Sequence, residues 1–127
     1  MNIVLWISQV LLAGLFILAG FSKTVQPMAE LAVKMPWVAT TPEWMVRLAG
    51  ISEVLGALGV IIPAGMRIRP GLTPLAAAGL ALVMTLAAVF HLVRGEFGYI
   101  PINLVLMALA LFVAYARQRR FPISPRD

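Results

Sequence analysis

The stretch WMVRLAGISEVLGALGVIIP, residues 44–63, decides the fold of this chain. It is apolar over most of its length and carries one carboxylate, Glu53, near its centre. A helix needs about 20 mostly apolar residues to cross the hydrocarbon of a bilayer. The stretch therefore predicts a membrane-spanning helix with an ionisable group about 15 Å deep, at about 1.5 Å of rise per residue. Pro63 is expected to help end this helix, because proline cannot donate a backbone hydrogen bond.

Three further segments, 3–22, 72–93 and 98–116, have the same length and character. Over the whole chain 61% of the 127 residues are hydrophobic and 12% are charged. Soluble domains are about 45–50% apolar and about 25% charged. A soluble fold of this size could not bury so much apolar surface. The sequence predicts an all-α fold: a single membrane domain, 1–127, built as an integral membrane four-helix bundle with a basic tail, 117–127.

The connection between the first two spans, residues 23–43, is long enough to have structure of its own. Met28, Leu31 and Met35 fall on one face of a helix, so the sequence predicts a short interfacial helix here. A structured loop of this length is often functional. It can equally act as an amphipathic lid that only covers the bundle.

The distribution of Lys and Arg predicts the orientation in the membrane. The side that holds both termini carries six basic residues and the other side carries four, so we expect cytoplasmic termini. The tail serves either as an ordinary stop signal or as a contact for anionic lipid headgroups. We expect no nucleic-acid binding, because the high pI of 10.8 follows from this topology. The six residues are Arg67, Arg69, Arg117, Arg119, Arg120 and Arg126, and the four are Lys23, Lys34, Arg47 and Arg94.

Glu53 must be protonated, paired or next to a wet cavity, since an ionisable group at that depth costs at least about 2.5 kcal/mol. Gly50 and Ala57 share its helical face and allow a neighbouring helix to approach closely, so Glu53 is expected to point into the bundle. All four spans contribute polar side chains to this outer half of the membrane. The candidate ligand-binding or proton-exchanging residues are Glu53, His91, Lys23, Asn103, Arg47 and Tyr99.

Each of these residues also has a structural interpretation. Glu53 can be a neutral acid hydrogen-bonded across helices, and Lys23 and Arg47 can be anchors at the membrane surface. The chain has no cysteine and one histidine. We therefore assign no metal site and no catalytic residue.

Several motifs recur in a recognisable order. LAGFSKTVQP (18–27) closes the first span with G-x-x-K, AGISEVLGALGVIIPAGMRI (49–68) contains E-x-x-G-x-x-G, and VFHLVRGE (89–96) supplies a late histidine. With an asparagine early in the last span, these motifs resemble the DoxX and DoxX-like family over roughly residues 10–115. The resemblance implies a four-helix protein of the cell inner membrane. Its matching polar positions are Lys23, Glu53, His91 and Asn103.

Some relatives in this family are associated with redox complexes, including quinone-linked oxidation of sulfur compounds and a membrane complex in thiol and superoxide defence. The resemblance thus implies a redox-associated accessory subunit without independent catalytic activity, with a quinone as the candidate cofactor. Thiol chemistry cannot be its own, because the chain has no cysteine. Two alternatives stay open: a proton-coupled carrier that uses Glu53, and a purely structural or assembly subunit. Expected partners are membrane lipids, a redox enzyme complex or further copies of the chain.

Overall fold

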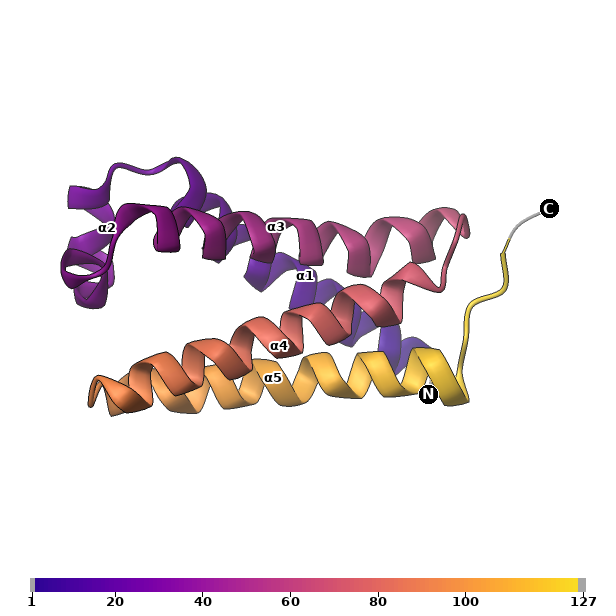
Figure 1. The fold of residues 1–127 in the computed structure, drawn as a ribbon. Coiled ribbons are helices and arrows are strands. Elements are labelled where there is room, and N and C mark those ends of the chain that lie inside the picture. Colours follow the sequence, from indigo (N-terminus) through magenta and orange to yellow (C-terminus); the bar gives the residue numbers. More distant parts are fainter. Residues whose placement is uncertain (1, 126–127) are drawn as a thin grey trace.

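The computed structural model describes residues 2–125, which form helices and turns and no strand (Figure 1). Four helices are long and apolar enough to cross a membrane. Large apolar side chains such as Leu18, Leu55 and Leu82 are more than half exposed on their outer faces, as lipid contact requires. The predicted all-α four-helix bundle is confirmed. Its long helices are α1 (Asn2–Val25), α3 (Glu43–Met66), α4 (Leu72–Val93) and α5 (Ile100–Tyr115).

The two ends of the bundle differ (Figure 1). One end holds the short helix α2 (Met28–Lys34) and the turn η1 (Pro36–Thr40), which together we call the lid segment, residues 28–40. A further turn, η2 (Phe97–Tyr99), precedes α5 at this same lid end. The opposite, terminal end holds the start of α1 and the last described residues.

The lid segment is fixed to the bundle by prolines and a small core of its own. Pro27 precedes α2, Pro36 begins η1 and Pro42 precedes α3. At such positions the missing N–H of proline costs no helical hydrogen bond. Leu31 and Val38 are fully buried against the first turn of α3. The long loop therefore contains the predicted short helix, held against the bundle rather than free.

The helices α1 and α3 cross where Gly20 meets Gly50. A Cβ atom on either glycine would lie 2.7 Å from the carbonyl oxygen of the other, so only glycine permits this approach. Small residues at a crossing let membrane helices pack closely without a hydrophobic driving force. The contact places the last turn of α1 directly beside the polar face of α3.

The helix α3 continues to Met66, past Pro63, whereas the sequence predicts that Pro63 helps to end it. Side chains of neighbouring helices donate to Val60 O, the carbonyl next to Gly59 O, which Pro63 leaves without its helical donor. Gln9 Nε2 of α1 donates to Val60 O at 2.9 Å, and Thr73 Oγ1 of α4 donates to the same carbonyl at 3.4 Å. Such side-chain donors stabilise the turn that contains a proline in a membrane helix.

The chain beyond α5 also differs from the sequence prediction. Residues 117–120, which the sequence pattern assigns to the tail, continue the helix as the wide π-helical turn η3 (Ala116–Arg120). Arg117 is buried against the bundle instead of extending into water. The non-helical segment therefore begins at Phe121.

The bundle is made of two helix pairs, α1 with α3 and α4 with α5, which meet through α3 and α4. This junction is closest near the terminal end, where Gly56 faces Leu80 and Gly59 faces Ala76. Towards the lid end α3 and α4 diverge (Figure 1). The apolar core lies in the middle and terminal half of the bundle, and space for a site remains at the lid end.

Candidate functional site

A cavity of about 490 Å³ lies at the lid end among the four long helices, and its walls are mainly apolar. Met35, Trp37 and Thr41 line it from the lid segment and the residue after it. Five of the six candidate residues predicted from the sequence also line this one cavity, and Arg47 does not. The five are Lys23, Glu53, His91, Tyr99 and Asn103.

Lys23 and Glu53 form an ion pair inside the bundle. Lys23 Nζ donates to Glu53 Oε1 at 2.6 Å, with side chains that are 13% and 2% exposed. The crossing of Gly20 and Gly50 brings the two helices close enough for this pair. Of the three states that the sequence allows for Glu53, the structure has the paired one. Each charge offsets part of the cost of burying the other.

Arg47 contributes to the fold beside the cavity. Its Nη1 donates to Lys23 O at 2.9 Å and to Gln26 O at 2.6 Å, carbonyls at the end of α1 that have no partner within the helix. Arg47 also pairs with Glu43 at 3.2 Å on the surface of α3. This position favours a structural role, because the guanidinium is committed to capping α1.

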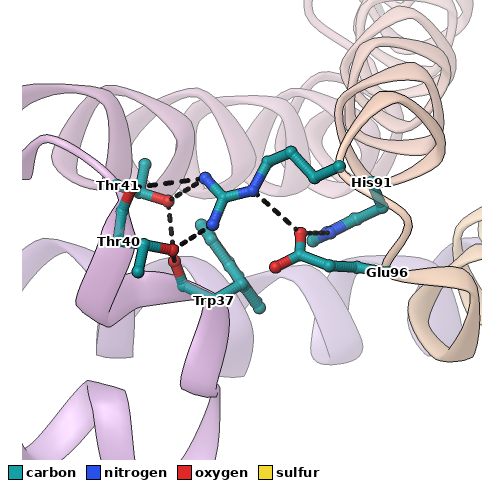
Figure 2. A network of polar contacts seen from close by, with 6 residues as sticks. Trp37, Thr40, Thr41, His91 and Glu96 are labelled. Carbon is teal, nitrogen blue, oxygen red and sulfur yellow. Dashed lines mark hydrogen bonds and ion pairs between the residues drawn. The ribbon is translucent and has the colours of Figure 1, made fainter.

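His91 is held by the turn that ends α4. Gly95 has a φ of 73°, and its N–H donates to Leu92 O while Glu96 N donates to His91 O at 2.8 Å. These two bonds form a Schellman motif, which requires the left-handed conformation that glycine adopts readily. The motif turns Glu96 back beneath α4, where Glu96 Oε1 accepts from His91 Nδ1 at 3.0 Å (Figure 2). That bond fixes the tautomer and orientation of the ring.

Arg94 connects this turn to the lid segment. Its Nε pairs with Glu96 Oε1 at 3.2 Å, and its Nη1 donates to Thr41 Oγ1 at 3.1 Å and to Thr40 O at 3.3 Å. Arg94 Nη2 also donates to the hydroxyl of Thr40. Figure 2 shows Thr40 and Thr41 facing His91 and Glu96 across this network. We call these contacts the latch, since they bind the lid segment to the end of α4.

Aromatic rings form the wall of the cavity beneath the latch. His91 stacks on Tyr99 with ring centroids 4.7 Å apart. The Trp37 ring meets His91 edge-on at 5.4 Å and Phe90 edge-on at 5.9 Å. Edge-to-face and offset-stacked arrangements are the favourable ones for such rings. The lid segment therefore closes the cavity with an aromatic surface that continues from α4.

Asn103 supplies a hydrogen-bond donor without an acceptor. The residue is 7% exposed and lines the cavity from the first turns of α5. Its Nδ2 has no hydrogen-bond partner within residues 2–125. A buried amide without a partner costs free energy, so its position calls for an explanation. In the same range, no group of three or more His, Asp or Glu side chains could hold a metal ion.

Part of the rim of the cavity is exposed on α3, α4 and α5. Four lining residues are more than half exposed, and all belong to membrane-spanning helices. The outer faces of these helices contact lipid, so the cavity reaches the lateral surface of the bundle. The four are Trp44, Leu48, Leu86 and Ile102.

The latch residues were not among the sequence candidates. The Arg-Gly pair at 94–95 is a typical signal for the end of a helix, and it predicts that the next residue turns back. That signal could have identified Glu96 as a partner of His91. Nothing in the sequence indicates that Thr40 and Thr41 meet Arg94, because the contact depends on how the lid segment folds over the bundle.

These features define a multi-pass α-helical membrane protein with a mostly apolar, laterally open cavity inside its bundle. The DoxX-like family matches residues 7–113, which is most of the chain, so the protein belongs to this family. No curated protein and no solved structure matches the chain.

Proposed function

We propose that the protein is a redox-associated accessory subunit whose cavity binds a quinone-like molecule or another small apolar ligand that carries hydrogen-bonding oxygen atoms. The observation that carries this proposal is Asn103: a buried amide donor without an acceptor among residues 2–125, on the wall of a mostly apolar cavity. An oxygen atom on a bound ligand would satisfy that donor. The association with redox systems rests on the family resemblance.

The size and shape of the cavity support a ligand of this class. Small-molecule sites typically have volumes of about 300–1,000 Å³ and mostly apolar walls with a few polar groups. At about 490 Å³ the cavity suits one aromatic or quinonoid ring system. The rings of Trp37 and Tyr99 offer surfaces against which a flat ligand can pack. Because the cavity reaches the lateral surface of the bundle, an apolar tail on such a ligand can stay in the membrane.

Two further polar groups are available to the head of such a ligand. The Lys23 ammonium has three N–H donors, and the ion pair with Glu53 uses one of them. His91 uses Nδ1 for Glu96, which leaves Nε2 as the remaining polar atom of its ring. With Asn103 these groups surround one cavity from three helices.

The Lys23–Glu53 pair favours this proposal over a proton-coupled carrier. A carrier of cations needs a carboxylate that is free to meet its solute, and Glu53 already meets a lysine at 2.6 Å. A purely structural polar cluster would need no open cavity beside it. Both alternatives therefore account for fewer of the observed features.

The proposal is tested by the thermal unfolding of the detergent-purified protein in the presence of a short-chain benzoquinone. A ligand at one hundred times its dissociation constant should stabilise the fold by about 2.7 kcal/mol, with a saturating concentration dependence. Asn103→Leu should weaken binding up to about tenfold, since one hydrogen bond contributes roughly 0.5–1.5 kcal/mol. Gln118→Leu, which removes an exposed amide at the terminal end, is the control. No saturable stabilisation, or equal affinity in Asn103→Leu, would contradict the proposal.

A further inference from the structure

A second cavity, of about 510 Å³, lies at the terminal end of the bundle, opposite the first. It is bounded by the first turns of α1, the last turn of α3, η3 and residues 121–124. Two arginines, Arg67 and Arg117, line it. This region plays no part in the function proposed above.

Arg117 is buried there to an unusual degree for an arginine, with 3% of its surface exposed. Its Nε donates to Gln9 Oε1 at 2.6 Å, and its Nη1 donates to Asn2 Oδ1 at 2.6 Å and to Phe121 O at 3.0 Å. The guanidinium also lies 5.4 Å from the centre of the Trp6 ring. Every one of these acceptors is neutral, so within residues 2–125 the charge of Arg117 is solvated by hydrogen bonds but not balanced by an anion.

Arg117 Nη2 has no hydrogen-bond acceptor among the described residues, and it is buried. Within residues 2–125 the acidic side chains are those at positions 30, 43, 53 and 96, and all four lie in the lid half of the protein. A buried guanidinium without an anion is costly, and charge-assisted hydrogen bonds to an anion offset that cost. The Nη2 edge of Arg117, which has no partner within residues 2–125, is therefore suited to an anionic ligand.

The surrounding residues hold the guanidinium in a fixed position. Gln9 is fully buried, and its Nε2 donates to Val60 O at 2.9 Å, which orients its oxygen towards Arg117. At the rim, Arg67 has a φ of 56° and its Nε donates to Ser124 O at 2.9 Å, so it keeps residues 121–124 against the cavity. The planar fork of arginine matches the oxygen geometry of phosphate.

We propose that the terminal cavity is a phosphate-binding site, with Arg117 as its buried ligand and Arg67 as the ligand at its rim. The phosphate can belong to an anionic phospholipid or to a soluble phosphate compound. The site lies at the end of the membrane-spanning helices, where lipid phosphates are found. Trp6, Phe121 and Ile123 add apolar wall beside the arginines.

The test is native mass spectrometry of the full chain in detergent, with phosphatidylglycerol compared with diacylglycerol of the same acyl chains. We expect one phosphatidylglycerol to bind about tenfold tighter or more, as one or two charge-assisted hydrogen bonds would give. Inorganic phosphate is the second arm. If inorganic phosphate displaces the lipid and raises the melting temperature at millimolar concentration, the natural ligand is a soluble phosphate compound. If inorganic phosphate has no effect, the natural ligand is the phospholipid.

Three variants localise the site. Arg117→Gln and Arg67→Gln should each lose the preference for the phosphate-bearing lipid. Arg119→Gln removes the same charge from an exposed position of the same turn. This variant should keep the preference for the phosphate-bearing lipid. Arg67 is exposed, so its variant tests the site even where Arg117→Gln fails to fold. The proposal is overturned if both lipids bind the wild-type protein equally and phosphate has no effect. It is also overturned if Arg119→Gln loses as much of the preference for phosphatidylglycerol as Arg67→Gln does.

Discussion

Lys23 Nζ and Glu53 Oε1 lie 2.6 Å apart at the crossing of α1 and α3, and the pair forms part of the wall of the lid-end cavity. The same crossing is made possible by Gly20 and Gly50, one turn before each charged residue. The close approach of the two helices, the Lys23–Glu53 ion pair and this part of the cavity wall thus form one local structure. Changes to any of the three should affect the others.

Gly50→Ala should destabilise the bundle. Its Cβ would lie 2.7 Å from both Gly20 O and Lys23 Cβ, so the helices must separate, and overpacking of this kind costs about 1–3 kcal/mol. Gly14→Ala is the control, because a Cβ there meets nothing within 4 Å. The free energy of unfolding in detergent measures both. Equal effects of the two substitutions would show that the crossing is not tightly packed.

Lys23→Met and Glu53→Gln should be strongly coupled. Each single substitution leaves one buried charge without its partner, whereas the double variant leaves none. We expect a coupling energy of about 0.5–3 kcal/mol in a double-mutant cycle, with the double variant more stable than the sum of the single effects predicts. Additive effects would mean that the two side chains do not pair in the folded protein.

Arg94→Gln should loosen the lid segment without unfolding the bundle. The partly exposed latch is expected to stabilise the closed position of the lid segment by about 1 kcal/mol. Its loss should therefore raise the fraction of molecules with an open lid segment roughly fivefold. Because the chain has no cysteine, labelling of Ala87→Cys inside the cavity by a charged, membrane-impermeant maleimide reports opening of the lid segment, since such a reagent does not enter from the lipid side. Lys34→Gln, a cation on the exposed side of α2, is the control. Unchanged labelling in Arg94→Gln would show that the latch does not control access.

Both termini should face the cytoplasm. The four spans place the lid segment and the termini on opposite sides, and the excess of basic residues lies with the termini. A single cysteine at the exposed position of Ala39 should react with an impermeant maleimide in intact cells. One at Ser124 should react only after the cells are lysed. The reverse pattern would invert the orientation and move the first cavity to the inner side.

The fold was predictable from the sequence because run length and hydropathy alone define membrane spans. The convergence of Glu53, Lys23 and His91 was predictable in part, since all are costly in lipid and therefore turn inwards. Which of them pair depends on the angle at which two helices cross. That angle follows from contacts such as Gly20 with Gly50, which a single sequence does not specify.

Arg117 illustrates the limit of the sequence prediction. A cluster of arginines after the last span is typical of a solvated tail, so nothing distinguishes the first of them from the rest. Its burial depends on the continuation of the helix through η3 and on Gln9, a residue more than one hundred positions away. The structure differs from the prediction for Pro63 for a similar reason, since donors on other helices stabilise the turn of α3 that contains this proline.

Photoaffinity labelling with an azido-quinone tests the central claim most directly, because it identifies the residues that the ligand touches. The account predicts adducts on cavity residues such as Trp37, Met84 and Asn103, and their loss when excess unlabelled quinone competes. Adducts confined to outward-facing residues such as Leu55 and Leu82, unaffected by competition, would contradict it and show that quinone meets this protein only as bulk lipid does.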